Sequence, residues 1–363
     1  MRIGVLGGGQ LGRMLGSAGV SLGFSFTFLE PAEECPAAAT GTWLRAGFDD
    51  VDALGELASR SDIITYEFEN VPVQAVRTLS ADRPVHPSAV SLEAAQDRLN
   101  EKTLFRRLGI PTPRFEAIDE GADLARAVER VGLPAVLKTR RMGYDGRGQR
   151  VLSGPAHLAP ALAALGGRAL LLEQHIPFQR ELSIIAVRGR SGELAFYPPI
   201  ENHHREGILR LSRAPAPCLT PALGALAGDY ARRLMEAMDH VGVLSLELFE
   251  SGGEVLANEM APRVHNSGHW TIEGAATSQF ANHLRAIAGL PLGATDVPGH
   301  CAMINLIGEL PDLSRVAGTP GAHVHLYGKQ PRPGRKLGHI TLCADHAEAL
   351  ALRLEAIQAL LER

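Results

Sequence analysis

The start of the chain limits the possible folds most strongly. The segment "RIGVLG" (2–7) has the pattern of a strand, "LGRMLGSAGV" (11–20) that of a helix, and "SFTFLE" (25–30) that of a second strand. A strand, a helix and a strand in close succession are typical of a βαβ unit, in which the two strands run parallel. We therefore expect a parallel sheet in the N-terminal part of the protein.

The turn inside this unit, "GGGQLG", carries glycines at positions 7, 9 and 12, and Glu30 follows about twenty residues later. This spacing is the fingerprint of a dinucleotide site, because bare backbone N–H groups at a helix N-terminus attract an anion. The fingerprint does not identify the anion. A dinucleotide site and a purely structural tight turn both remain open at this point.

The rest of the chain, 363 residues in all, suggests two or three domains. "DIITYEF" (62–68) and "RPVHP" (83–87) resemble further strands, and Pro87 and Ser88 precede an expected helix over "SLEAAQDRLNEKTLFRRLG" (91–109). From residue 111 the pattern is strand, helix, strand, glycine loop, strand, helix and strand. We place domain boundaries near residues 100 and 176, which gives segments 1–100, 101–176 and 177–363.

The last segment is rich in strand patterns, with helices expected near 221–240 and from His346 onward. The expected strands are "RELSIIAVRG", "ELAFYPPI", "VLSLELFE", "EVLANEM", "CAMINLIG", "AHVHLYG" and "GHITLCA".

Composition excludes some classes of protein. Lys and Arg number 36 and Asp and Glu 40, so the net charge of −4 indicates neither a nucleic-acid binder nor a membrane-surface helix. The longest uncharged segment, 14–29, is shorter than the roughly 20 apolar residues of a membrane span. No secretion signal is recognisable, so we expect a cytoplasmic protein with reduced cysteines. His265 and His269 are four positions apart, but Asn-Ser-Gly between them disfavours a helical zinc pair.

A glycine-rich basic segment, "RRMGYDGRGQR" (140–150), follows an apolar strand that ends in Lys138. An ammonium group at such a position needs an anionic partner, and a phosphate would serve. The glycines would let the backbone N–H groups close over a polyphosphate. Asp145 would repel phosphate, so we expect it to face a second substrate, with Arg147 offsetting its charge. A mobile surface hairpin is the alternative.

Two carboxylates are expected to lie opposite each other in a hairpin. "VLSLELFE" and "EVLANEM" flank Ser-Gly-Gly, a turn signal, which places Glu247 opposite Asn258 or Glu259. The leucines at 244, 246 and 248 would share the other face of the strand. Because paired carboxylates repel, a cation should lie between them, and oxygen ligands suit Mg²⁺ that also binds phosphates. Two ordinary surface acids are the alternative.

Polar donors are densest directly after Glu259, in "MAPRVHNSGHWT", where Arg263, His265, Asn266, Ser267 and His269 occur within seven positions. The planar guanidinium of Arg263 suits a small oxyanion such as bicarbonate or a carboxylate. His265 would transfer protons or act as a structural donor.

Taken in order, Lys138, "GYDGRGQ", "LLEQHI", "LELF", "NEMAPRVHNSGHWT" and the late "RPGRK" resemble the ATP-grasp ligases over nearly the whole chain. In the first domain the resemblance depends on "GGGQLGRML" and "TYEFENVP". It is strongest to the branch that carboxylates an aminoimidazole ribonucleotide in purine biosynthesis. The implied fold is α/β and α+β: an ATP-grasp fold with an N-terminal Rossmann-like domain, a small lid domain and a larger C-terminal mixed-sheet domain.

The resemblance also implies roles for particular residues. Glu247 and Glu259 would hold Mg²⁺, and Asp145 would orient the exocyclic amine of the ribonucleotide, with Arg147 beside it. Bicarbonate would lie among Arg263, His265 and Asn266. The ribonucleotide phosphate would be bound by Gln10, Leu11, Lys329, Arg335 and Lys336, which turns the first glycine turn into a phosphate site. The implied ATP site comprises Arg98, Lys138, Gly143, Tyr144, Asp145, Gly146, Arg147, Gly148, Gln149, Glu173, Gln174, His175, Ile176, Glu181, His204, Asn258 and Glu259.

The activity implied is ATP-dependent carboxylation of 5-aminoimidazole ribonucleotide with bicarbonate, through carboxyphosphate, with release of ADP and phosphate. A homodimer acting on small molecules is expected, with no nucleic-acid or membrane partner. Three alternatives remain: a formate-using glycinamide ribonucleotide transformylase, an NAD-dependent oxidoreductase suggested by the glycine turn, and a nucleotide-binding protein without catalysis.

Overall fold

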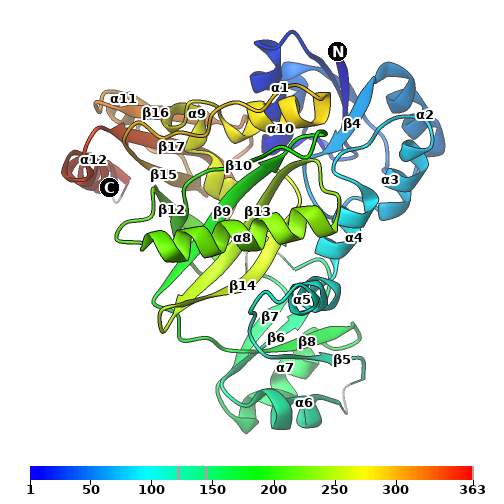
Figure 1. Ribbon diagram of the computed structural model, residues 1–363, viewed down its shortest axis with the longest axis vertical. Coiled ribbons are helices and arrows are strands. Elements are labelled where there is room, and N and C mark those ends of the chain that lie inside the picture. The colour runs from blue at the N-terminus through cyan, green and yellow to red at the C-terminus, as the bar shows by residue number, and fades with distance from the viewer. Residues whose placement is uncertain (121–122, 144–145, 362–363) are drawn as a thin grey trace.

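The computed structural model describes residues 1–120, 123–143 and 146–361. Within them the chain forms two four-stranded sheets and one nine-stranded sheet. The N-terminal sheet and the nine-stranded sheet lie together at one end of the long axis, and the small sheet lies at the other end (Figure 1).

The N-terminal sheet has the strand order β3-β2-β1-β4, and β1 pairs in parallel with both β2 and β4. The predicted βαβ unit is therefore confirmed. The residues of β1, β2 and β4 are nearly all buried, as expected for a parallel sheet covered on both faces. The elements are β1 (Arg2–Leu6), α1 (Gln10–Val20), β2 (Ser25–Leu29), η1 (Pro36–Thr40), β3 (Thr42–Leu44), α2 (Val51–Arg60), β4 (Ile63–Tyr66), α3 (Val73–Ser80) and α4 (Ala89–Gln96).

Two predictions for this part of the chain are wrong. Residues 83–87 do not form a strand, and only Val85 forms a single bridge, to Ile64 of β4. Pro84 and Pro87 have no N–H group, so the segment cannot continue the hydrogen bonds of a strand pair. The long helix expected over 91–109 is broken at Asp97, whose backbone is extended. The Asp97 carboxylate accepts a hydrogen bond from the backbone N–H of Leu99 at 3.0 Å and starts a new helix, α5 (Arg98–Arg107).

The small sheet follows the predicted alternation of elements and has the order β5-β8-β6-β7. One face packs on α6 and α7 through a single apolar cluster that includes Leu137 and Leu172. Because side chains alternate along a strand, Lys138 and Glu173 lie on the opposite face. The elements are β5 (Phe115–Ile118), α6 (Asp123–Val131), β6 (Ala135–Thr139), β7 (Gln149–Leu152), η2 (Pro155–His157), α7 (Leu158–Leu165) and β8 (Leu170–Gln174).

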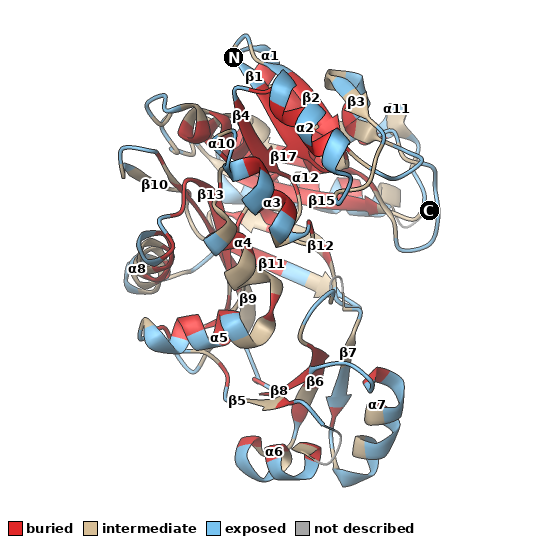
Figure 2. Cartoon of the chain, turned by 90° about the vertical axis from the view of Figure 1, so that its right-hand side faces the viewer, coloured by how far each residue is buried: buried red, intermediate tan, exposed pale blue. Residues whose placement is uncertain are grey.

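The nine-stranded sheet runs β14-β13-β9-β11-β12-β15-β17-β16, with β10 paired to β9. Figure 2 shows the strands of the two upper sheets mostly buried, whereas α6 and α7 are largely exposed. The strands are β9 (Arg180–Arg188), β10 (Leu194–Phe196), β11 (Ile200–Arg205), β12 (Ile208–Ala214), β13 (Gly242–Ser251), β14 (Glu254–Ala261), β15 (His300–Ile307), β16 (Ala322–Leu326) and β17 (Lys336–Ala344). The helices are α8 (Pro221–Ala237), η3 (Asn266–Gly268), α9 (Thr271–Gly274), α10 (Gln279–Ala288), α11 (Leu313–Ala317) and α12 (Ala347–Leu361).

Sequence patterns missed α10 and the β11–β12 hairpin, and the strand expected over 193–200 divides into β10 and the first residue of β11. The buried face of α10 includes Gln279, Asn282 and His283, and that of β11 includes Glu201 and Asn202. These side chains are polar yet buried because they are hydrogen-bonded, so no alternating apolar pattern marks β11. In α10, buried Phe280, Leu284 and Ile287 do stand at helical spacing, so an apolar signal for this helix was present in the sequence. In the part of the chain that the structure describes, every helix is too short or too polar to cross a membrane.

His283 joins the N-terminal sheet to the large sheet. Its Nδ1 accepts a hydrogen bond from the backbone N–H of Val243 at 3.1 Å, so the other nitrogen, Nε2, carries the proton toward Thr65 Oγ1 at 2.9 Å. Both bonds use the neutral imidazole, and burial lowers the pKa of His283 to about 3. The joint between the two sheets therefore requires an uncharged histidine.

Acid should weaken this joint. The unfolded chain binds a proton at His283 below a pKa of about 6.5 and the folded chain does not, so stability present above pH 6.5 is lost as the pH falls. At pH 5 this loss amounts to about 2 kcal/mol. Urea unfolding at pH 7.5 and at pH 5 gives the free energy of unfolding at each pH. The difference between these two values should be smaller in His283→Gln than in the wild type by about that amount, whereas substitution of the exposed His346, in His346→Gln, should leave it unchanged. Equal pH dependence in the wild type and His283→Gln would contradict this account.

Candidate active site

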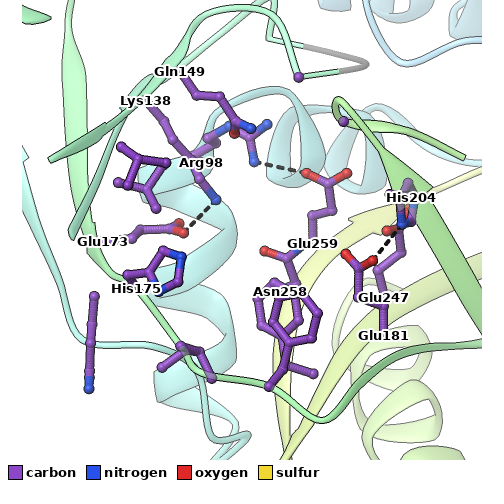
Figure 3. Close-up of a pocket in the computed structure, with 18 of the residues that line it drawn as sticks. Arg98, Lys138, Gln149, Glu173, His175, Glu181, His204, Glu247, Asn258 and Glu259 are labelled. Carbon is purple, nitrogen blue, oxygen red and sulfur yellow. Dashed lines mark hydrogen bonds and ion pairs between the residues drawn. The ribbon is translucent and has the colours of Figure 1, made fainter. Parts of the chain in front are cut away.

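A cavity of about 260 Å³ separates the open face of the small sheet from the nine-stranded sheet. Figure 3 shows Lys138 and Glu173 on one side of it, and Glu247, Glu259 and His204 on the other. The structure thus brings together most of the predicted ATP site. Predicted residues that line this cavity are Arg98, Lys138, Gly146, Arg147, Gln149, Glu173, Gln174, His175, Ile176, Glu181, His204, Asn258 and Glu259.

A second cavity of about 530 Å³ lies beside the first and shares Arg98, His204, Gly207, Glu247 and Glu259 with it. Two ligands in the two cavities would therefore meet at the paired carboxylates. The second cavity contains the residues expected around bicarbonate and part of those expected around the ribonucleotide, namely Gln10, Leu11, Arg263, His265, Asn266 and Lys336. Gly143, which was predicted for the ATP site, lines this second cavity and not the first.

A buried ionic cluster forms the wall of the first cavity. Glu173 accepts from Lys138 Nζ at 2.6 Å and lies 3.3 Å from Lys102 Nζ, so the expected anionic partner of Lys138 includes a protein carboxylate. Burial alone would raise the pKa of Glu173, but Lys102, Lys138 and Arg98 together lower it to about 2. Lys102 is completely buried, with its pKa lowered by burial. Both lysines therefore contact the same carboxylate.

The predicted hairpin register is confirmed, because Glu247 pairs with Glu259 across β13 and β14. The next pair is Leu248 with Ala257, so Asn258 is the extra residue of a β-bulge. Burial would raise the pKa of Glu259, but Arg98, whose Nη1 lies 2.9 Å away, and Lys138 lower it to about 2. Glu247 lies 3.1 Å from His265 Nε2.

These residues suit Mg²⁺. Asn258 Oδ1 is buried and has no hydrogen-bond partner in the described part of the chain, and it lies beside the two carboxylates. A ligand set of oxygens alone, completed by phosphate oxygens and water, is what Mg²⁺ prefers. Among residues 1–120, 123–143 and 146–361, no group of three or more His, Cys, Asp or Glu side chains is arranged to hold a metal ion. A bound cation would therefore depend on phosphate oxygens and water as well as on the protein.

The donor-rich segment after β14 lies in the second cavity, held by partners that the sequence did not reveal. Arg263 Nε donates to the carboxylate of Glu69. Burial alone would raise the pKa of Glu69, but the guanidinium of Arg263 lowers it. Asn266 exchanges hydrogen bonds with Asn305 of β15 at 3.1 and 2.8 Å. His269 is buried beside His339, away from both cavities.

The first glycine turn already binds protein carboxylates. The N–H groups of Gly9 and Gly12 donate to Glu67, and that of Gly8 donates to Glu30 at 2.8 Å. A side chain at Gly9 would collide with Glu67. The anion attracted by this helix N-terminus is therefore a side chain of the protein, and the expectation that these N–H groups bind a nucleotide phosphate is wrong for Gly8, Gly9 and Gly12.

The glycine-rich loop is held at its base. Arg140 forms two 2.9 Å hydrogen bonds with Asp97, the residue that separates α4 from α5. Gly146 and Gly148 have positive φ angles of 73°, which glycine adopts without strain. Gly148 is close to Thr139, outside the lining of either cavity. The predicted Tyr144 and Asp145 lie outside the described residues.

The residues predicted to bind the ribonucleotide phosphate are partly assembled. Lys329 Nζ donates to the side chain of Gln10, and burial lowers the pKa of Lys329 to about 8. Arg335 contacts Glu34 at 2.6 Å and does not line the cavity, whereas Lys336 does.

Sequence reasoning missed five ionic residues that shape the site: Glu67, Glu69, Asp97, Glu101 and Lys102. Glu101, for example, is buried and accepts from the backbone N–H of Met260 at 2.6 Å. The available signal was "TYEFENVP", where two acidic residues follow a buried strand.

Comparison with known proteins agrees with this geometry. Residues 103–280 match the family model of the ATP-grasp domain, residues 1–96 that of the ribonucleotide synthetase preATP-grasp domain, and residues 301–353 that of the phosphoribosylaminoimidazole carboxylase C-terminal domain. The chain therefore has the ATP-grasp fold expected from the resemblance, and it is an ATP-dependent ligase of that class.

Individual relatives identify the family within the ATP-grasp class. The chain is 52% identical over 363 residues, 100% of both proteins, to N5-carboxyaminoimidazole ribonucleotide synthase of Pseudomonas aeruginosa. It is 46% identical to the enzyme of the same name from Brucella melitensis, covering 93% of this chain and 95% of that one. This chain belongs to the N5-carboxyaminoimidazole ribonucleotide synthase family.

Solved structures support the same assignment. The crystal structure of N5-carboxyaminoimidazole ribonucleotide synthetase from Thermus thermophilus matches with a TM-score of 0.95 and 56% identity, covering 99% of this chain and 98% of that chain. The Aspergillus clavatus enzyme in complex with ADP and 5-aminoimidazole ribonucleotide matches with a TM-score of 0.92 and 33% identity, covering 100% and 99%.

Removing the charge of Glu173 should destabilise the protein. Glu173→Gln removes the carboxylate that contacts both Lys102 and Lys138, and the free energy of unfolding should fall by about 3–5 kcal/mol. Adding Lys102→Met should recover part of that loss, because it removes one of the uncompensated charges. Urea unfolding of both variants measures this effect, with exposed Glu254→Gln as the control. If Glu173→Gln is as stable as Glu254→Gln, the cluster does not have the strength assigned to it.

Proposed function

We propose that this chain carboxylates 5-aminoimidazole ribonucleotide with bicarbonate at the expense of ATP, forming the N5-carboxyamino product of purine biosynthesis. The observation that carries the proposal is the pair of adjoining cavities that meet at Glu247 and Glu259. A related enzyme has been crystallised with ADP and 5-aminoimidazole ribonucleotide together, which are two ligands of the kinds that the cavities would hold.

ATP is assigned to the first cavity. Its phosphates would lie near Arg98 and Lys138, and Gly146, which lines this cavity with a positive φ angle, would allow the backbone to approach them closely. The neighbouring end of β8, with Glu173 to Ile176, would take the base, and Glu181 a ribose hydroxyl. Glu181 already bonds His204 at 2.9 Å, which orients its carboxylate (Figure 3).

Mg²⁺ is assigned to Glu247, Glu259 and the nearby Asn258 oxygen. When bound, it would neutralise charge on the phosphates during phosphoryl transfer. The residues of the chain would do the rest by positioning. Arg263, fixed by Glu69, and Asn266, fixed by Asn305, would hold bicarbonate in line with the terminal phosphate.

The carboxyphosphate formed would break down to CO₂ and inorganic phosphate in the second cavity. The amine of the ribonucleotide would capture the CO₂ before water does and would release one proton as the N–C bond forms. Asp145 is proposed to orient that amine, with Arg147 beside it, and Gln10, Leu11, Lys329, Arg335 and Lys336 to bind the ribonucleotide phosphate. We further propose a cytoplasmic homodimer and domain boundaries near residues 100 and 176. Small molecules would be its partners, with no nucleic acid or membrane involved.

Each substrate should be required for ADP formation. ADP release should fall to background when 5-aminoimidazole ribonucleotide or bicarbonate is omitted, and formate should not replace bicarbonate. Chelation of Mg²⁺ should abolish turnover, and Glu247→Gln should lower kcat by at least about 100-fold because phosphate charge is left uncompensated. A coupled ADP assay measures all of these. ADP formation that needs formate, or that survives chelation, would contradict the proposal.

Asp145→Asn separates nucleotide binding from carboxylation. The amide keeps the size of the side chain but loses the charge proposed to orient the amine. The ATP Kd should stay within about 2-fold of the wild-type value, while kcat for ribonucleotide carboxylation falls by about 100-fold. Calorimetric titration with an ATP analogue and a product assay provide the two readouts. Wild-type turnover with all substrates present would remove Asp145 from the mechanism.

A further inference from the structure

Two cysteines face each other outside the lining of both cavities. Cys301 of β15 and Cys343 of β17 are directly paired in the antiparallel register, and their sulfur atoms lie 3.5 Å apart. All four cysteines of the chain fall within the described residues, and all are free thiols.

The backbone is already suited to a covalent bond. Directly paired residues on antiparallel strands have Cα atoms about 4.5–5.5 Å apart, within the span of about 4.4–6.8 Å that a disulfide bridges. The sulfur atoms would need to approach by roughly 1.5 Å to reach the bond length of about 2.05 Å. Rotation of the two side chains supplies such a movement. Gly274 of α9 packs closely against Cys301, and a side chain at position 274 would collide with the Cys301 sulfur. This contact confines the Cys301 sulfur to the side of Cys343.

The two thiols differ in exposure and in chemistry. Cys301 is only 2% exposed, whereas Cys343 is half-buried, so an external reagent reaches Cys343 first. The S–H of Cys301 donates to the sulfur of Cys343 and thereby lowers the pKa of Cys343, an effect that burial and the charge of Glu273 oppose. The same shared hydrogen bond, with burial, raises the pKa of Cys301. Cys343 is therefore the first nucleophile of the pair.

We propose that Cys301 and Cys343 form a reversible dithiol–disulfide pair that reacts with small disulfides such as oxidised glutathione. The thiolate of Cys343 attacks one sulfur of the reagent, forms a mixed disulfide and releases one thiolate. Cys301 then loses its proton to solvent and attacks the sulfur of Cys343, which releases the second thiolate. The two protein thiols are oxidised by two electrons and the reagent is reduced to two thiols, so the exchange balances.

The bond would brace the sheet without distorting the site. Asn305 lies four residues from Cys301 on β15, and its partner His339 lies four residues from Cys343 on β17. Asn305 is hydrogen-bonded to Asn266, which lines the second cavity. Because the disulfide would form within the native register, these contacts would remain. The bond would close a loop of about forty residues in the unfolded chain, which favours the folded state by restricting the unfolded one.

The experiment incubates the purified, reduced protein with oxidised glutathione, alkylates the remaining thiols, and identifies linked peptides by mass spectrometry after digestion. We expect a peptide pair containing Cys301 and Cys343. The oxidised protein should unfold about 5 °C higher than the reduced one and keep its rate of ADP formation within about 2-fold. Dithiothreitol should reverse both changes.

Single variants distinguish a pair from two independent cysteines. In Cys301→Ala, glutathione should remain attached to Cys343, because the resolving thiol is missing. In Cys343→Ala, Cys301 should stay unmodified, because it is buried. Cys218→Ala, which removes an exposed cysteine, is the matched control and should still form the linked peptides. A stable glutathione adduct on Cys343 of the wild-type protein, or no reaction at either cysteine, would overturn the proposal.

Discussion

The pairing of Glu247 with Glu259 across β13 and β14 is the constraint on which the site depends. Two carboxylates opposite each other on neighbouring strands are unfavourable unless positive charge surrounds them. Arg98 supplies part of that charge in the protein itself, and His265 lies against Glu247. Since Arg98 begins α5 and His265 follows β14, the helix, the hairpin and the donor-rich segment are all positioned around this one electrostatic requirement.

A second group of charges extends the same arrangement into the small sheet. Arg98 and Lys138 both lower the pKa of Glu259, and both also lower that of Glu173. The two acidic residues therefore share their cations, although one belongs to the small sheet and the other to the large sheet. A polyphosphate entering between the sheets would compete with both carboxylates for these cations. Binding of a nucleotide there would thus be coupled to the contact between the two sheets.

Much of this organisation follows from the sequence because it depends on local rules. The Ser-Gly-Gly turn and the alternation of the leucines in β13 placed Glu247 opposite Asn258 or Glu259, and the structure has the second of these pairs. The filling of the glycine turn by Glu67 could not be derived in this way, because Glu67 follows β4, far along the chain from the turn. The helix break at Asp97 has a local cause, the cap on the N–H of Leu99, but the bond from Arg140 that also holds Asp97 comes from a distant segment.

The glycine turn shows why a motif specifies a physical environment and not a ligand. Its exposed N–H groups and helix N-terminus create a positive end that must be satisfied by some anion. In a dinucleotide-binding protein that anion is a pyrophosphate. Here it is the carboxylate of Glu67, which is buried, with its pKa raised by that burial and lowered by the N–H groups of Gly12 and Gly9. The glycine turn therefore holds α1 in place through Glu67, and Gln10 and Leu11 of the same turn line the second cavity.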